Sequence, residues 1–364
     1  MLLLIGFLAF VITSISATTY SCDSKAPCGC STTTTSSVTA KIVGGENATA
    51  YTWNWMVSLQ YSNSHICGAS LITSEYAVTA AHCLENYIKY LDNLSIRVGS
   101  NIIKDTTTAT IQRRKIIKAT IHPDYKGADS NDYSNDIGII QFAPLNTSTS
   151  SKINFICLPS EGQDPFQDNT SLVAIGWGVT YESQYAPISN YLLQVTVQVY
   201  SSSSDACQAS PMTNSTVQFC AGVAEGGKGM QSYSSKDNNC YFVCIHCLDT
   251  CQGDSGGPLM AFVNNRWVLA GITSAGNGCA RVGQVGLYTR VSQLIRFINS
   301  LVNPTVASTI SDLTTTTSFN MILIHNSTDL NGTIIEKNTA YTLEKSVSIS
   351  LISSILLFFI TCIL

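Results

Sequence analysis

The sequence predicts an all-β domain, either a barrel or a sandwich, that ends in one helix. Between residues 42 and about 301, short runs of β-branched and aromatic residues alternate with Gly, Asn and Ser turns. Many short strands at close spacing are typical of barrels and sandwiches. The clearest runs are 55–59, 95–98, 137–141, 191–199 and 267–272. The helical period is carried by Val291, Leu294, Ile295, Ile298 and Leu301.

The composition limits the class of protein. The chain has 364 residues, of which 45% are hydrophobic and 12% are charged, and its net charge is −4. This length suffices for one large domain or two small ones with a buried core. Nucleic-acid binders carry basic stripes, so the low and mildly acidic charge argues against a nucleic-acid partner. Fourteen cysteines indicate an oxidising compartment.

Residues 1–17 are predicted to be a signal peptide. Residues 1–12 are almost wholly apolar, and the small residues Ser14, Ser16 and Ala17 follow them. The usual Lys or Arg before the apolar run is missing. A retained membrane anchor is the alternative, although the run is shorter than the ~20 residues that span a bilayer. The protein is therefore expected to be secreted or to lie on the outer face of the plasma membrane.

The C-terminal segment predicts attachment to a membrane. Residues 303–346 are rich in Thr, Ser and Asn and are expected to form a stalk. Residues 347–364 are apolar and carry no charge. Small residues, such as those at 331–333 and 338–340, then a polar spacer and a hydrophobic tail, form the pattern of a glycosylphosphatidylinositol (GPI) attachment signal. A single transmembrane helix is the alternative, and either one makes the membrane a partner.

Asn-X-Ser/Thr sites are distributed along the chain. A single site of this kind is a weak signal, but a secreted chain gives each one a route to glycosylation. The chain is therefore expected to be a glycoprotein. The sites are Asn47, Asn93, Asn146, Asn169, Asn214, Asn326 and Asn331.

Three residues could together form a nucleophilic site. His82 lies in Thr-Ala-Ala-His-Cys, Asp136 in Asn-Asp-Ile and Ser255 in Gly-Asp-Ser-Gly-Gly-Pro. A serine hydroxyl needs a base such as imidazole, and a carboxylate fixes the tautomer of that imidazole. Glycines around Ser255 let the amides of Gly253 and Ser255 turn towards an oxyanion. Each residue alone also fits a structural histidine, a turn aspartate or a glycine-rich turn, so the prediction depends on their joint occurrence.

Residues 41–301 resemble the chymotrypsin/trypsin family of serine proteases. The motifs at 42–45, 79–83, 135–137, 176–178 and 253–258 appear in the family order. The resemblance implies two six-stranded antiparallel β-barrels, a C-terminal helix and an active site in the cleft between the barrels. It also implies that His82 is the general base, Asp136 its orienting group and Ser255 the nucleophile, with no cofactor and no metal.

The resemblance also implies activation by proteolysis. Residues 18–41 would be a prosegment, and cleavage after Lys41 would free the α-amino group of Ile42 to pair with Asp254. Because a buried charge needs a partner, this ion pair would order the oxyanion hole. The activator would be another trypsin-like protease or this protein itself. Protein protease inhibitors are further partners that the resemblance implies.

Substrate specificity is expected to follow from Asp249, six residues before Ser255. In the family this position is the floor of the primary pocket, where a carboxylate selects protein or peptide substrates with Arg or Lys. Gly276 and Gly286 match the positions that keep the pocket open, although Asp249 could also be a solvated loop acid. Ala275 stands where the family has Trp, which puts subsite preference in doubt.

The resemblance implies the disulfides Cys67–Cys83, Cys207–Cys220 and Cys251–Cys279. Cys157 would hold one prosegment cysteine, and the other two would pair with each other. Cys362 lies in the tail that a GPI signal would lose. One thiol is then left over among three cysteines of residues 228–248. The prosegment cysteines are Cys22, Cys28 and Cys30, and those of residues 228–248 are Cys240, Cys244 and Cys247.

Residues 228–248 interrupt the family pattern, and three interpretations remain open. A zinc site would use Cys240, Cys244, His246 and Cys247, but their spacing matches no standard structural site. An extra loop with disulfides is the second interpretation. A translated intron is the third, since codons for Gly227-Lys228 and Leu248-Asp249 can contain GT and AG boundaries whose excision restores the aspartate. Genomic DNA decides between the last two.

The sequence as a whole predicts a trypsin-like endopeptidase zymogen at the cell surface. It would cleave after Arg or Lys through an acyl-enzyme. The alternative is a catalytically impaired surface binding protein with a protease-like fold, which Ala275 and the insertion at 228–248 keep open.

Overall fold

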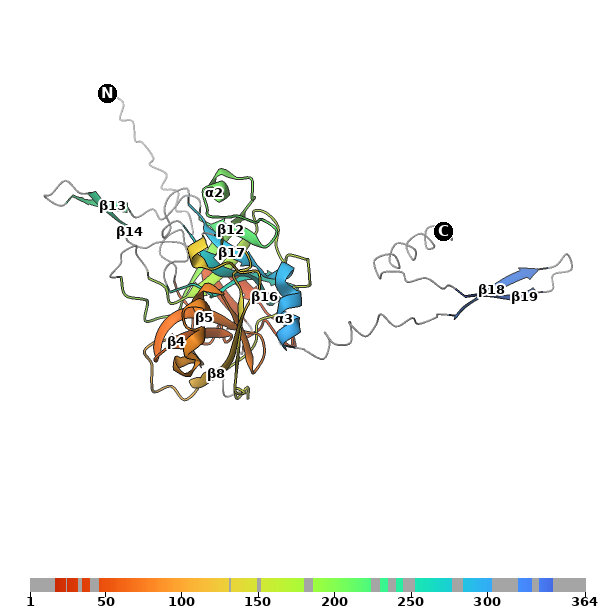
Figure 1. The fold of residues 1–364 in the computed structure, drawn as a ribbon, viewed down its shortest axis with the longest axis horizontal. Helices are drawn as coiled ribbons and strands as arrows, with labels where there is room; N and C mark the ends of the chain where they lie inside the picture. Colours follow the sequence, from red (N-terminus) through yellow and green to blue (C-terminus); the bar gives the residue numbers. More distant parts are fainter. Residues whose placement is uncertain are drawn as a thin grey trace, which may run out of the picture. The chain divides into compact units, whose positions relative to one another are not determined.

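The computed structural model forms two units, Met1–Val302 and Asn303–Leu364, which are described separately (Figure 1). In the described part of the chain, no helix is long and apolar enough to cross a membrane. The structure describes residues 17–23, 25–31, 35–39, 46–130, 132–148, 152–179, 186–223, 230–234, 240–244, 253–276, 284–302, 320–328 and 334–342.

The first half of the protease-like region is a closed six-stranded antiparallel barrel. Its strands follow one another around the barrel in the order β4-β5-β6-β9-β8-β7. Ser62 and Asn63 join β4 to β5 with φ of 49° and 66°, the left-handed backbone that two-residue hairpin turns need. The strands are β4 (Met56–Tyr61), β5 (Ser64–Leu71), β6 (Tyr76–Thr79), β7 (Leu94–Val98), β8 (Gln112–Ile121) and β9 (Gly138–Phe142).

The second half is a second six-stranded antiparallel barrel, in the order β10-β15-β16-β17-β12-β11. Pairing of β10 with β11 closes this ring, and the short strand β3 (Glu46–Asn47) adds to β11. Asn264 and Asn265 make the β15–β16 hairpin turn, again with positive φ. The strands are β10 (Ser171–Gly176), β11 (Leu193–Tyr200), β12 (Gln218–Gly222), β15 (Pro258–Val263), β16 (Arg266–Ala275) and β17 (Gly286–Arg290).

The predicted C-terminal helix is present at the end of the second barrel. It starts as a 3₁₀ turn, η4 (Val291–Leu294), and continues as α3 (Ile295–Val302). Ile295 and Ile298 are buried on one side of α3, as the helical period predicts. The prediction of two six-stranded barrels with a C-terminal helix is therefore confirmed.

One hydrophobic cluster extends from the first barrel into the second, and a separate cluster fills the interior of the second barrel. Trp53 packs edge-on against Trp55 and Trp267, with ring centroids 5.8 Å and 5.0 Å apart. The Trp55 indole also donates to the sulfur of Met260 at 3.1 Å. Trp55 immediately precedes β4, whereas Met260 and Trp267 lie in β15 and β16, so these contacts join the barrels. Aromatic pairs of this kind contribute about 0.5–1.5 kcal/mol each beyond their burial.

The segment before residue 41 is docked on the second barrel. It forms a short hairpin of β1 (Ala17–Ser21) and β2 (Thr35–Thr39), and disulfides join Cys22 to Cys30 and Cys28 to Cys157. Gly29 exchanges backbone hydrogen bonds with its surroundings, donating to Phe155 and accepting from Trp267. Tyr20 packs against Phe262 and Trp267 of the β15–β16 hairpin.

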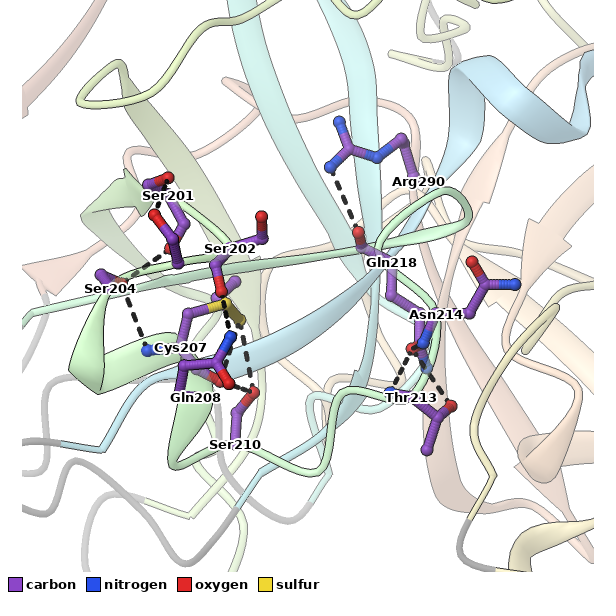
Figure 2. The surroundings of a disulfide bond; sticks show 12 residues. Ser201, Ser202, Ser204, Cys207, Gln208, Ser210, Thr213, Asn214, Gln218 and Arg290 are labelled. Atoms are coloured by element: carbon purple, nitrogen blue, oxygen red, sulfur yellow. Dashed lines mark hydrogen bonds between the residues drawn. A yellow bond between two sulfur atoms is a disulfide. The ribbon is translucent and has the colours of Figure 1, made fainter.

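A disulfide and a cap fix the short helix α2 (Asp205–Gln208). Figure 2 shows Ser204 accepting from the amide of Cys207 at 3.3 Å, which satisfies one free N–H of the first turn. Cys207 is bonded to Cys220 of β12. Nearby, the Gln218 side chain accepts from the amides of Thr213 and Asn214. The Thr213 hydroxyl donates to Asp132 at 2.7 Å and thereby links this loop to the segment that leads to Asp136.

Two further hairpins are described in part. β13 (Met230–Ser234) pairs with β14 (Cys240–Cys244) within residues 228–248. β18 (Asn320–Thr328) pairs with β19 (Ile334–Thr342) inside the segment predicted as a stalk. His246 and Cys247 lie outside the described residues, as do residues 1–16 and 343–364.

Candidate active site

Strand pairing in the first barrel brings His82 and Asp136 together. β6 leads into the short helix α1 (His82–Glu85), and Asp136 precedes β9 by two residues. The register of these paired strands places Thr79 opposite Gly138, so their flanking residues meet. His82 Nδ1 lies 2.8 Å from Asp136 Oδ2, and the His82 amide donates to Asp136 Oδ1 at 3.0 Å.

Asp136 is completely buried and is held as a carboxylate. Burial alone would raise its pKa, but the charge of His82 and hydrogen bonds from His82 and Ser274 outweigh this and lower the pKa below its ordinary value. The Ser274 hydroxyl donates to Oδ2 at 2.6 Å. Thr289 donates to the Asp136 carbonyl at 2.9 Å and fixes the backbone from the second barrel.

The imidazole of His82 is oriented through one of its two nitrogens. Burial by itself lowers the pKa of His82, but the carboxylate of Asp136 and, to a smaller extent, Glu85 raise it overall. Because Nδ1–H donates to Asp136, Nε2 is left as the acceptor. The sulfurs of Cys67 and Cys83 lie close to this ring, but they are bonded to each other and so are not thiolate ligands for a metal.

The turn that carries Ser255 packs directly against the first barrel. Gly68 of β5 donates its amide to the Ser255 carbonyl at 2.7 Å. A Cβ on Gly256, whose φ is +75°, would lie 2.2 Å from the Thr79 hydroxyl, so only glycine fits there. Thr79 is three residues before His82, and the turn that carries Ser255 therefore lies beside the strand that positions the imidazole.

The Ser255 hydroxyl and the His82 ring are not joined by a hydrogen bond in the part of the chain that is described. Hydrogen bonds between catalytic groups are often long in a free enzyme and shorten in the substrate complex. The structure thus brings His82 and Asp136 into contact and places Ser255 on a turn packed beside the strand that leads to them.

The Gly176-Trp177-Gly178 segment makes room for the side chain of Asp254. A Cβ on Gly176 or Gly178 would lie 1.9 Å or 2.2 Å from the Asp254 carboxylate. The Gly178 amide donates to Asp254 Oδ1 at 2.7 Å. Lys41 and Ile42, the predicted activation site, lie outside the described residues.

The family model for Trypsin matches residues 42–298, which is most of the chain. The chain belongs to the trypsin family of serine proteases. The resemblance of the sequence motifs to this family is therefore confirmed. The trypsin domain contains the disulfides Cys67–Cys83 and Cys207–Cys220, whereas Cys251 and Cys279 lie outside the described residues.

A second histidine of the trypsin domain, His65, contacts the turn that carries Ser255. Its two ring nitrogens lie 2.9 Å from Ser58 Oγ and 2.9 Å from the Gly253 carbonyl. Burial lowers the pKa of His65. The neutral ring then donates from Nε2 to Gly253 and accepts the Ser58 hydroxyl on Nδ1. Its edge also meets Trp177, with centroids 5.7 Å apart.

The ends of β16 and β17 of the trypsin domain bring two predicted pocket residues together. Ala275 is paired with Leu287, so Gly276 and Gly286 flank the same ladder position. Asp249, the predicted pocket acid, lies outside the described residues. Two functional contacts were missed by sequence reasoning, those of Ser274 and His65. Neither residue lies in a motif that predicts its contact. The one hint in the sequence is that Ser274 stands next to Ala275, the position where the family has Trp.

Proposed function

We propose that this trypsin-family protein is a serine endopeptidase that cleaves after Arg or Lys. The observation that supports the proposal is the buried Asp136, whose Oδ2 lies 2.8 Å from His82 Nδ1 and leaves Nε2 as the acceptor of the ring. A carboxylate in this place fixes the tautomer and stabilises the imidazolium that forms during catalysis.

In the proposed mechanism, His82 Nε2 takes the proton of Ser255 Oγ as that oxygen attacks the scissile carbonyl. The amides of Gly253 and Ser255 stabilise the oxyanion of the tetrahedral intermediate. His82 then gives the proton to the leaving amine, which departs and leaves an acyl-enzyme on Ser255. A water molecule, deprotonated by the same nitrogen, attacks the acyl group and regenerates the hydroxyl.

The proposed specificity rests on Asp249. This residue stands six positions before Ser255, and a carboxylate at the floor of the pocket would pair with the side chain of Arg or Lys. Gly276 and Gly286, at one ladder position of β16 and β17, leave the pocket wall without side chains. Ala275 removes bulk where the family has Trp, so preferences beyond the primary pocket should be broad.

We also propose that the protein is a zymogen activated between Lys41 and Ile42. The new α-amino group of Ile42 would pair with Asp254, whose side chain already fills the space beside Gly176 and Gly178. The activator would be a trypsin-like protease, and protein inhibitors would act on the product. Glycosylation and attachment to the outer plasma membrane by a GPI anchor complete the proposal.

A fluorophosphonate probe, which reacts with an activated serine, tests the catalytic proposal. The full chain is cut at Lys41 with a trypsin-like protease, the cutting enzyme is removed, and the probe is added. Wild type should be labelled, and Ser255→Ala should not. If the cut wild type stays unlabelled while folded, the enzyme proposal fails and the impaired surface binding protein becomes the better account. Release of the protein from cells by phospholipase C tests the GPI anchor separately.

A further inference from the structure

Strand β8 carries a concentration of positive charge. Within six consecutive positions of this strand lie Arg113, Arg114, Lys115 and Lys118, in a chain whose net charge is −4. Surfaces usually mix both signs of charge, so four cations at this spacing are unusual. We call these four residues, together with Ile117, the β8 basic surface.

The side chains of β8 are available to a partner. The first part of the strand, Gln112 to Lys115, is paired with β7, and the second part, Ile116 to Ile121, is paired with β9. Arg113 and Lys115 are two positions apart and so project from the same face of the strand. Both side chains are exposed. A partner at this surface would be recognised by these side chains.

A β-bulge brings an apolar side chain to the same surface. The register of the β8–β9 ladder shifts between Ile116 and Lys118, so Ile117 is the extra residue. Bulges re-aim side chains, and Ile117 is 61% exposed while Ile116 is buried. Ile117 is among the most exposed large hydrophobic residues of the described chain, and it lies directly beside Lys118.

Three of the four cations of the β8 basic surface donate to neutral oxygen atoms. Arg113 donates to the Gln60 side chain at 3.1 Å, and Arg114 donates to the Pro144 carbonyl at 3.1 Å. Lys115 donates to the backbone carbonyl of Asp92 at 2.9 Å. No ion pair between described residues includes any of the four cations. Their positions are therefore partly fixed while their charge is not neutralised.

The accumulated charge also acts on a buried arginine of the neighbouring strand β7. Arg97, opposite Arg113, is almost completely buried, and its Nη2 donates to the carbonyls of Ile102 and Asp105. Burial lowers the pKa of Arg97, and the charge of Arg113 lowers it further, more than Asp105 raises it. A partner with carboxylates would relieve this repulsion.

We propose that the β8 basic surface binds an extended acidic peptide segment that carries apolar residues among its carboxylates. Alternate side chains of an extended peptide repeat at about 7 Å, as do Arg113 and Lys115 on β8. The exposed Ile117 favours a peptide over a sulfated glycan, because a glycan offers no apolar side chain to cover it. Binding does not depend on the proposed peptidase activity. If that activity is present, the surface favours substrates with an acidic segment away from the cleaved bond.

Fluorescence anisotropy on the full chain with Ser255→Ala tests binding without cleavage. The probe is a fluorescein-labelled decapeptide of glutamates with two central leucines, and the same peptide with glutamines is its control. The glutamate peptide should bind, and its affinity should fall as salt rises from about 50 to about 300 mM, since salt screens exposed charges. The glutamine peptide should bind at least about tenfold more weakly.

Two double variants separate the site from overall charge. Arg113→Glu with Lys115→Glu should weaken binding about tenfold or more, whereas Lys25→Glu with Lys104→Glu, at exposed positions elsewhere, should change it less than about twofold. Both change the net charge equally. Thermal denaturation verifies folding, and the milder Arg113→Gln with Lys115→Gln replaces the first variant if it does not fold. Equal losses of peptide affinity in the two double variants, or no binding of the glutamate peptide to the unaltered surface, overturn the proposal.

Ile117→Asn distinguishes a peptide from a glycan. This variant should weaken binding of the glutamate–leucine peptide about threefold or more, in line with the loss of a buried apolar contact. A heparin-derived octasaccharide is the competing probe. If the octasaccharide binds more tightly than the peptide and the Ile117 variant affects neither, the surface is a glycan site and the peptide proposal is wrong.

Discussion

The amide of Gly178 donates a 2.7 Å hydrogen bond to the carboxylate of Asp254, the residue directly before Ser255. The two residues are 76 positions apart in the chain, so this contact ties the β10 end of the second barrel to the nucleophile turn. A Cβ on Gly178 would lie 2.2 Å from the same carboxylate.

Gly178→Ala should therefore displace Asp254 and with it the amides of Gly253 and Ser255, which form the proposed oxyanion hole. The expected loss of stability is about 1–3 kcal/mol, as for other overpacked sites. The expected fall in kcat/KM is about tenfold or more. Gly162→Ala is the control for backbone strain alone, because its φ is +69° but its Cβ meets nothing within 4 Å. It should cost about 1 kcal/mol of stability and leave kcat/KM nearly unchanged. Urea denaturation and hydrolysis of a short arginine substrate measure both effects. An active Gly178→Ala enzyme would contradict the importance of this contact.

Ser274→Ala should lower activity although Ser274 touches no substrate atom in the proposed mechanism. The variant removes a 2.6 Å donor from Asp136 and raises the pKa of that carboxyl group. Hydrogen bonds to charged groups contribute about 1.5–3 kcal/mol, so kcat/KM should fall about 10- to 100-fold. Thr273→Ser, on the same strand, should leave kcat/KM nearly unchanged. Equal activity of Ser274→Ala and wild type would exclude a role for this hydroxyl.

Asp136→Asn should change both the rate and the pH profile. His82 must be neutral to act as a base, and Asp136 raises its pKa, so activity should rise with pH through a value above the ordinary 6.5 or so of histidine. Removing the carboxylate lowers the pKa of His82, which moves this limb of the kcat/KM profile to lower pH. The rate should fall about 10⁴-fold because the tautomer is no longer fixed. Asp124→Asn, an exposed aspartate nearby, should leave the profile in place.

His65 should make stability fall in acid. Burial lowers its pKa in the folded state, so the unfolded chain binds a proton first as pH drops below about 6.5. The stability that neutral His65 contributes is fully present above that pH and is lost as pH falls towards the folded-state pKa. The difference in unfolding free energy between wild type and His65→Asn should shrink between about pH 7.5 and 5. Urea denaturation at several pH values measures this, and a constant difference would count against it.

The Cys28–Cys157 disulfide should keep the prosegment attached after cleavage at Lys41. On a gel without reductant, the cut protein should run as one species, and reductant should release the short fragment. Replacing both cysteines with serine should release the fragment without reductant and should cost about 2–4 kcal/mol of stability before the cut. Replacing both residues avoids a free thiol. A fragment that separates from the cut wild type without reductant would show that this bond is absent.

The strands and the helix were predictable because their signals are local. Apolar runs at 55–59 and 267–272 coincide with β4 and β16, and the period from Val291 to Leu301 coincides with η4 and α3. The motifs around His82, Asp136 and Ser255 are equally local. These motifs identify the residues but do not predict the distance between His82 and Asp136, which depends on the pairing of β6 with β9.

The supporting contacts could not be predicted because their partners are distant in the chain. Ser274 donates to a residue 138 positions away, and His65 contacts the Gly253 carbonyl 188 positions away. A serine in a strand carries no signal for such a partner. Asp249, Ile42 and the insertion at 228–248 remain predictions, since the residues that would test them lie outside the described part or have only their strands described.

The tryptophan contacts between the barrels have a consequence for how the molecule unfolds. Trp53 and Trp55 in the first barrel cannot lose their contacts with Trp267 and Met260 without exposing core of both barrels. The two barrels should then unfold in one cooperative transition, with no state in which one barrel persists alone. A destabilising substitution in either barrel should then shift one common melting transition, and the two barrels should keep their mutual contacts until the whole domain unfolds.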